Sequence, residues 1–245
     1  MRALATGARD LHCGLTVLRR APRLWIWLVA PALLTLVLFA GAIAGIAWLV
    51  HPAVAWVVAH LPHALAGIAG TLLTIIIVAL LGFAALVIFT AVTGAIAGPF
   101  NEMLSERLEA RLRGSEPEPF ALGRFVHELG LGIVHAIRRI IIAIVAAIVV
   151  LLIGLVPVVG APVALVLGFV FAARGAAYDC YDAVLARRAL AYSDKLAFLA
   201  RHRGRTFGLG AAVAALLLVP GVNLVALGLG AAAATVAAHE LESAS

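Results

Sequence analysis

The sequence predicts an all-α integral membrane protein with two long transmembrane helices, two partly penetrating helical hairpins and amphipathic cytoplasmic helices. The first observation is an uncharged stretch of 78 residues from Leu24 to Asn101, and the second is a pair of uncharged stretches of 34 residues each, 140–173 and 206–239. The third is a composition with 64% hydrophobic and 12% charged residues and a mean hydropathy of +1.14. Because about 20 residues of helix cross a bilayer, the first stretch has room for two spans and each later stretch for one long span or two short arms.

Residues 1–245 form a single membrane domain in this interpretation. It begins with an amphipathic segment, 1–23, and a first span, 24–50. A second span, 64–97, runs into a cytoplasmic helix, 101–113, and two hairpins follow at 140–173 and 206–239. The run from Leu24 to Val50 is much longer than the apolar core of a secretory signal peptide, which has about 7–15 residues. We therefore expect this run to be a retained span.

Two amphipathic segments are predicted on the cytoplasmic side. In 9–20, Leu11, Leu15 and Leu18 share one helical face, opposite to arginines. In 122–137, a similar apolar face lies opposite to polar and charged residues. Helices of this kind lie in the headgroup layer of a membrane, so we expect both segments to be surface anchors.

Turn and cap residues follow the second span. Gly98-Pro99 is expected to bend the chain, and Asn101 can cap a helix that runs to Arg113. Glu109 and Arg113 have the i,i+4 spacing of a helical ion pair. The segment 116–119, with the sequence Glu-Pro-Glu-Pro, interrupts the helix and predicts a mobile linker.

A proline-containing turn interrupts each 34-residue stretch near its centre, at 157–162 and at 220–223. Proline removes a backbone donor and disfavours helix at the residue before it, so each stretch is predicted to fold as a helical hairpin. The arms 140–156 and 206–219 are about 25 Å and about 21 Å long, which suits partial penetration of the bilayer. The tips must then be buried in protein or lie beside water.

The distribution of charge predicts the orientation. All 18 Lys and Arg residues lie in 1–23, 102–139 and 174–205, and the acidic end of the chain carries Glu240 and Glu242. The positive-inside bias makes this side cytoplasmic, which predicts a multi-pass protein with both termini in the cytoplasm and 51–63 outside. The basic clusters lie next to the membrane, so anionic lipid headgroups are a better partner than nucleic acid.

Two groups of residues are candidates for binding an anion. A helix that starts near Gly160 and Ala161, or near Gly221 and Asn223, points its N-terminus and free N–H groups into the bilayer, which favours a negative ligand. These turns can also be purely structural. The second group consists of arginines near the membrane surface, namely Arg19, Arg20, Arg23 and Arg174. Arg174 is either a cation within the membrane or its interface, or a side chain that snorkels to the headgroups.

Missing motifs narrow the function. No Asp or Glu occurs inside the uncharged stretches, so the carboxylate of a proton- or sodium-coupled carrier is missing and passive, channel-like passage is favoured. The sequence has no P-loop, HExxH or GxSxG, so we expect no enzyme and no cofactor. We expect no metal site at the loop histidines His60 and His63 or at the free thiols Cys13 and Cys180.

Several motifs resemble a known family. They are Gly98-Pro99-Phe100-Asn101 followed by Leu104 and Glu106, the tip from Pro157 to Gly160, Tyr178 and Tyr181 before Arg187-Arg188, and Pro220 to Leu224. In this combination they resemble the CysZ sulfate-permease family, part of the etoposide-induced-protein superfamily. The resemblance implies an oligomeric inner-membrane protein with two long spanning helices and two partly penetrating hairpins, which passes sulfate inward for cysteine synthesis.

The sequence departs from the family pattern at two places. CysZ proteins often carry a basic doublet between two prolines at the start of the first span, but between Pro22 and Pro31 this sequence has Trp25 and Ile26 in the doublet's place. Asp182 stands where a proline is expected after the tyrosine pair. The family's sulfate-contacting role is therefore not carried over to individual residues.

Two classes of function remain open. The first is a homo-oligomeric permease or channel for sulfate or a similar oxyanion. The second is a non-transporting membrane organiser that binds lipid or protein through its basic cytoplasmic face. The sequence GAIAG at 41–45 and again at 94–98 permits close helix crossing, either between copies or within one chain.

Overall fold

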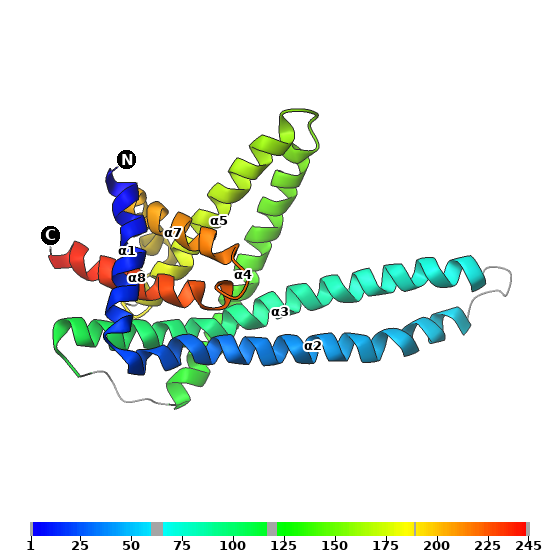
Figure 1. Ribbon diagram of the computed structural model, residues 1–245, viewed down its shortest axis with the longest axis horizontal. Coiled ribbons are helices and arrows are strands. Elements are labelled where there is room, and N and C mark those ends of the chain that lie inside the picture. Colours follow the sequence, from blue (N-terminus) through cyan, green and yellow to red (C-terminus); the bar gives the residue numbers. More distant parts are fainter. Residues whose placement is uncertain (1, 60–65, 117–121, 189, 244–245) are drawn as a thin grey trace.

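The computed structural model describes residues 2–59, 66–116, 122–188 and 190–243, and these residues form helices joined by short turns, with no strand among them. The elements are α1 (Arg2–Arg19), a 3₁₀ turn η1 (Pro22–Leu24), α2 (Trp25–Ala59), α3 (Ala66–Arg113), α4 (Leu122–Gly154), α5 (Gly160–Leu185), α6 (Tyr192–Arg201), α7 (Arg203–Leu217) and α8 (Asn223–Ser243). The all-α prediction is confirmed. Figure 1 shows two hairpin arms, α2–α3 and α4–α5, which leave a compact group formed by α1, α7 and α8.

The α2–α3 arm has fewer interruptions than predicted. α2 continues past position 50 to Ala59 with Pro31 and Pro52 inside the helix, and α3 runs unbroken through Pro99. The prediction that Asn101 caps a new helix is wrong, because Asn101 lies within α3. In apolar helices the backbone group freed by a proline is satisfied by small local adjustments, and Pro99 is also fully buried against its neighbours. The histidines of the loop at 60–65 lie outside the described residues.

The α4–α5 arm differs from the prediction in one respect. The expected surface helix 122–137 and the expected arm 140–156 are one helix of 33 residues, α4, with a length of about 50 Å. No proline or glycine lies between 133 and 153, so nothing stops the helix at the boundary between its two halves. Residues 117–121, which include most of the predicted linker, lie outside the described residues.

Turns occur close to both predicted proline-containing sites. The chain turns at 155–159 between α4 and α5 and at 218–222 between α7 and α8. Pro162 was expected in the turn between α4 and α5. It lies instead in the first helical turn of α5, where its missing N–H costs no helical hydrogen bond. Gly221 has a φ of 81°, a left-handed conformation that glycine adopts without steric cost, and Val158 adopts a φ of 68°.

The N-terminal helix is packed against protein, which corrects the prediction of a headgroup-layer helix. The buried residues of α1 are Gly7, Asp10, Gly14 and Leu18, and its partners are α7 and α8. The helices approach closely, since a Cβ atom added to Gly7 would lie 1.9 Å from the backbone O of Arg205. An amphipathic pattern does not distinguish these two environments, because a membrane surface and a protein groove both accept an apolar face.

The last helix, α8, lies at the centre of the compact group. It contacts α1, α3, α5 and α7, and its buried face consists mainly of alanine and glycine, which allow the close approach of several helices. Among the described residues three helical stretches are long and apolar enough to cross a membrane, Pro22–Val50, Gly160–Leu185 and Asn223–Ser243. The apolar window is 61% buried within the protein in the last stretch and 6% in the first, so α8 is enclosed by protein whereas α2 presents its apolar surface outward.

Candidate functional site

Charged side chains from all four charged blocks of the sequence meet in one region, which we call the charged layer. Its members are Asp10 of α1, Glu109 and Arg113 of α3, Arg187 and Arg188 after α5, Arg205 of α7, and Glu240 and Glu242 of α8. The acidic end of the chain therefore lies against arginines that are distant in the sequence.

Arg205 joins α1, α7 and α8. Its Nε donates to Oδ2 of Asp10 at 2.6 Å, and its Nη2 donates to Oδ1 of Asp10 at 2.8 Å and to Oε2 of Glu240 at 2.5 Å. The Asp10 side chain is 4% exposed. The hydrogen bonds with Asp10, and secondarily with Glu240, raise the pKa of Arg205 above its ordinary value although burial acts in the opposite direction. The charge of Arg205 is thus balanced by two carboxylates.

Glu109 is the centre of a second group of ion pairs. Its Oε2 accepts from Nη2 of Arg187 at 2.6 Å, and its Oε1 accepts from Nη2 of Arg113 at 2.6 Å. Glu242 lies 3.0 Å from the same Arg113 nitrogen and also pairs with Arg188. The predicted i,i+4 pair of Glu109 and Arg113 is confirmed, and these contacts tie the end of α3 to the ends of α5 and α8.

A chain of polar contacts runs inward from this group. Nη2 of Arg187 donates to Oγ of Ser105 at 2.8 Å, and that hydroxyl lies 2.8 Å from Oγ1 of Thr235. Thr235 in turn donates to the backbone O of Ala231. Ser105 and Thr235 are buried, so the Arg187 side chain reaches the interface between α3 and α8. The only sequence signal for this contact is the spacing of Ser105, Glu109 and Arg113 along one face of α3.

Asp182, which departs from the family pattern, has a structural role. Its Oδ1 accepts a hydrogen bond from Nζ of Lys195 at 2.7 Å, and the pair connects α5 to α6. The Lys195 side chain is 11% exposed, so the pair is largely shielded from solvent. A proline at position 182 would remove this connection.

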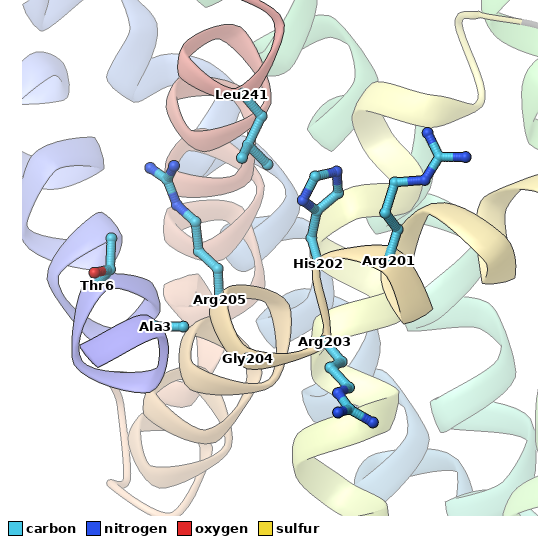
Figure 2. Close-up of a pocket in the computed structure, with 8 residues that line it drawn as sticks. All are labelled: Ala3, Thr6, Arg201, His202, Arg203, Gly204, Arg205 and Leu241. Atoms are coloured by element: carbon cyan, nitrogen blue, oxygen red, sulfur yellow. The ribbon is translucent and has the colours of Figure 1, made fainter. Parts of the chain in front are cut away.

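A pocket of about 350 Å³ opens where α6 ends and α7 begins (Figure 2). It is lined by Ala3, Thr6, Arg201, His202, Arg203, Gly204, Arg205 and Leu241. In Figure 2 the Arg205 side chain is directed between α1 and α8, whereas Arg201 and Arg203 extend to either side of the junction. Burial, and then the charges of Arg201 and Arg205, lower the pKa of His202 from its ordinary value of 6.5. The pocket is therefore basic even while His202 is neutral.

The residues predicted to bind an anion lie in separate parts of the structure. Arg19 is the last residue of α1, Arg20 follows it, and Arg23 lies in η1. Gly160 and Ala161 begin α5 at the far end of the α4–α5 arm (Figure 1). Arg174 is exposed on α5, about 21 Å along the helix from Gly160. Gly221 and Asn223 lie at the turn between α7 and α8. One copy of the chain does not bring these groups together.

At both tips, backbone hydrogen bonds already occupy some of the N–H groups that were predicted to bind an anion. The helices do start where predicted, at Gly160 and at Asn223. However, the N–H of Gly160 donates to the O of Val156 at 3.0 Å, and that of Asn223 donates to the O of Val219 at 3.1 Å. Fewer N–H groups are therefore available at these helix starts than at an open helix end.

No group of three or more His, Cys, Asp or Glu side chains suited to a metal ion occurs in the part of the chain that the structure describes. Cys13 and Cys180 are free cysteines, and Cys180 is fully buried against Gly230.

Comparison with known proteins places these features in a family context. A protein named "Sulfate transporter CysZ" from Pectobacterium atrosepticum is 27% identical over 210 residues, which cover 85% of this chain and 76% of the relative. Proteins of the same name from Pseudomonas fluorescens strain Pf0-1 and Pseudomonas syringae pv. tomato are each 29% identical, over 94% of this chain and 91% and 90% of their own lengths. The family profile described as "Sulfate transporter CysZ/Etoposide-induced protein 2.4" matches residues 10–227, from Asp10 of the charged layer to α8, and the chain therefore belongs to this family.

Proposed function

We propose that this protein is a sulfate permease of the bacterial inner membrane, which takes up sulfate for cysteine synthesis. The observation that carries the proposal is the separation of charge: four charged blocks gather in one layer, and the apolar arms that leave this layer contain no Asp, Glu, Lys or Arg at 24–101 and 140–173. Membership of the CysZ family and the names of the relatives support sulfate as the substrate. The alternative, a membrane organiser without transport, has no comparable support.

The charged layer is proposed to face the cytoplasm together with both termini. Ion pairs between Asp10, Arg205 and Glu240 support a common side for the beginning and the end of the chain. The blocks 1–23, 102–139 and 174–205, which supply most of this layer, hold all 18 Lys and Arg residues of the chain, and this favours the cytoplasmic side and contact with anionic headgroups. The arms then enter the bilayer from the inside, with the α4–α5 and α7–α8 hairpins penetrating only part of it.

Passage is proposed to be passive. Coupling to protons or sodium ions usually relies on a carboxylate within the membrane, and the uncharged stretches have none. Arg19, Arg20, Arg23 and Arg174 are the proposed contacts of the anion near the membrane surface, with the tips at Gly160, Ala161, Gly221 and Asn223 as polar points along the path. Because one copy leaves these groups apart, a homo-oligomer is proposed to assemble the path.

Uptake of radiolabelled sulfate into proteoliposomes tests this function. We expect saturable uptake well above that of empty liposomes, with competition by unlabelled sulfate at lower concentration than by phosphate or chloride. Equal competition by all three anions would contradict sulfate specificity. Absence of uptake, with folded and oligomeric protein shown in the vesicles, would support the organiser alternative.

A further inference from the structure

The pocket at the α6–α7 junction is separate from the residues proposed for transport. It contains neither Arg19, Arg20 and Arg23 nor Arg174, and it lies beside the first residues of α1 and the last turn of α8. Its walls come from three parts of the chain: Ala3 and Thr6 of α1, Leu241 of α8, and the junction itself. The pocket therefore needs a role of its own.

The charge of the pocket is only partly balanced. Asp10 and Glu240 both bind Arg205, whose guanidinium is thereby fixed and neutralised. Arg201 and Arg203 are exposed, and among the described residues neither has an ion-pair partner. Two guanidinium groups without counterions thus flank a pocket of about 350 Å³, which is larger than a tetrahedral oxyanion requires.

The chemistry of these side chains indicates the class of ligand. Guanidinium groups bind the oxygens of phosphate and sulfate through paired, charge-assisted hydrogen bonds. Arg201 and Arg203 extend to either side of the junction in Figure 2, and no ion pair among the described residues holds either side chain in that orientation. The half-buried His202 lies between them in the sequence, and its ring can donate a further hydrogen bond.

We propose that this pocket binds a tetrahedral oxyanion group, a phosphate or a sulfate, at a site distinct from the transport path. The group comes either from a free anion or from the headgroup of an anionic phospholipid, because the recognising chemistry is the same. This site does not depend on transport, and a protein without sulfate flux can still possess it.

Binding to purified protein in a neutral detergent tests the free anion. Calorimetric titrations with inorganic phosphate and with sulfate, at constant ionic strength set with chloride, are compared for the wild type, R201Q/R203Q and R2Q/R9Q. The last variant removes the same charge from exposed positions of α1 that do not line the pocket. We expect R201Q/R203Q to weaken binding at least fivefold and R2Q/R9Q to leave it unchanged.

A second measurement tests the lipid as source. Native mass spectrometry counts phosphatidylglycerol molecules retained by protein from mixed phosphatidylglycerol–phosphatidylcholine vesicles, for the same three proteins. Lower retention in R201Q/R203Q alone assigns the pocket to a lipid headgroup, and weaker calorimetric binding in R201Q/R203Q alone assigns it to a free anion. The proposal is overturned if R201Q/R203Q and R2Q/R9Q bind the free anions equally well and also retain equal numbers of phosphatidylglycerol molecules.

Discussion

Arg205 binds Asp10 across 195 residues of sequence through two hydrogen bonds, Nε to Oδ2 at 2.6 Å and Nη2 to Oδ1 at 2.8 Å. The same guanidinium reaches Glu240, so one side chain fixes the first helix and the last helix against α7. This contact organises the side of the protein from which both apolar arms extend.

Replacement of Asp10 tests the strength of this connection. D10N removes the negative charge from a pair that is largely shielded from solvent and leaves Arg205 with Glu240 alone. Breaking a buried ion pair costs about 3–5 kcal/mol, and partial exposure of Arg205 reduces the expected loss to about 2–3 kcal/mol. Thermal unfolding in detergent measures the effect. R9Q, on the exposed face of α1, is the control, and equal Tm values for D10N and R9Q would contradict the proposed role.

The close crossing of α1 and α7 predicts sensitivity to a single methyl group. A Cβ atom at Gly208 would lie 2.2 Å from the backbone O of Leu4, so G208A must separate the two helices, at a cost of about 1–3 kcal/mol. At Gly175, in the interior of α5, a Cβ atom would meet nothing within 4 Å. G175A is therefore expected to be neutral or to stabilise by about 0.5–1 kcal/mol. A higher Tm for G208A than for G175A would be inconsistent with the crossing.

His202 gives the stability a defined pH dependence. Its pKa is lowered from 6.5 in the folded protein, so as the pH falls below 6.5 the unfolded chain binds a proton before the folded chain does. This difference lowers the free energy of unfolding at acidic pH. It has no effect at pH values above the pKa of His202 in the unfolded chain. We expect H202Q to lose less stability than the wild type between about pH 7.5 and about pH 5.5. Identical pH profiles of Tm for the two proteins would argue against the lowered pKa.

The proposed orientation predicts which positions a membrane-impermeant reagent reaches from each side of the membrane. In a background without Cys13 and Cys180, cysteines at the exposed positions Arg9, Arg111 and Arg203 should react with a membrane-impermeant maleimide only after the inner membrane is opened. A cysteine at Ala59, the exposed end of α2, should react in intact spheroplasts. Labelling of position 203 in intact spheroplasts would exclude the proposed orientation.

Local chemistry allowed the positions of the two proline-containing turns to be predicted from the sequence. Pro157 and Pro220 lie in the observed turns, because proline and its neighbours act on the adjacent backbone whatever the tertiary context. The i,i+4 pair of Glu109 and Arg113 was predictable for the same reason, since helix geometry alone brings the two side chains together.

The remaining features depend on packing that sequence patterns do not specify. The change from polar to apolar residues near position 140 does not end a helix, because the backbone needs a breaker such as proline, and α4 therefore runs unbroken through it. The contacts of Arg187 with Ser105 and of Arg205 with Asp10 join residues 82 and 195 positions apart, so no local spacing indicates them. The pocket at His202 depends on the position of α1, which amphipathicity alone does not determine.

The initial rate of sulfate uptake into proteoliposomes, with and without pH and sodium gradients, tests the central claim most directly. We predict uptake that neither gradient stimulates, because the apolar arms contain no carboxylate to couple a cation, and rates at least about threefold lower for R23Q and R174Q than for R9Q. All three variants must be shown to be folded and assembled in the vesicles. Uptake that requires a gradient, or no uptake above empty liposomes by the unmodified protein, would contradict a passive sulfate permease.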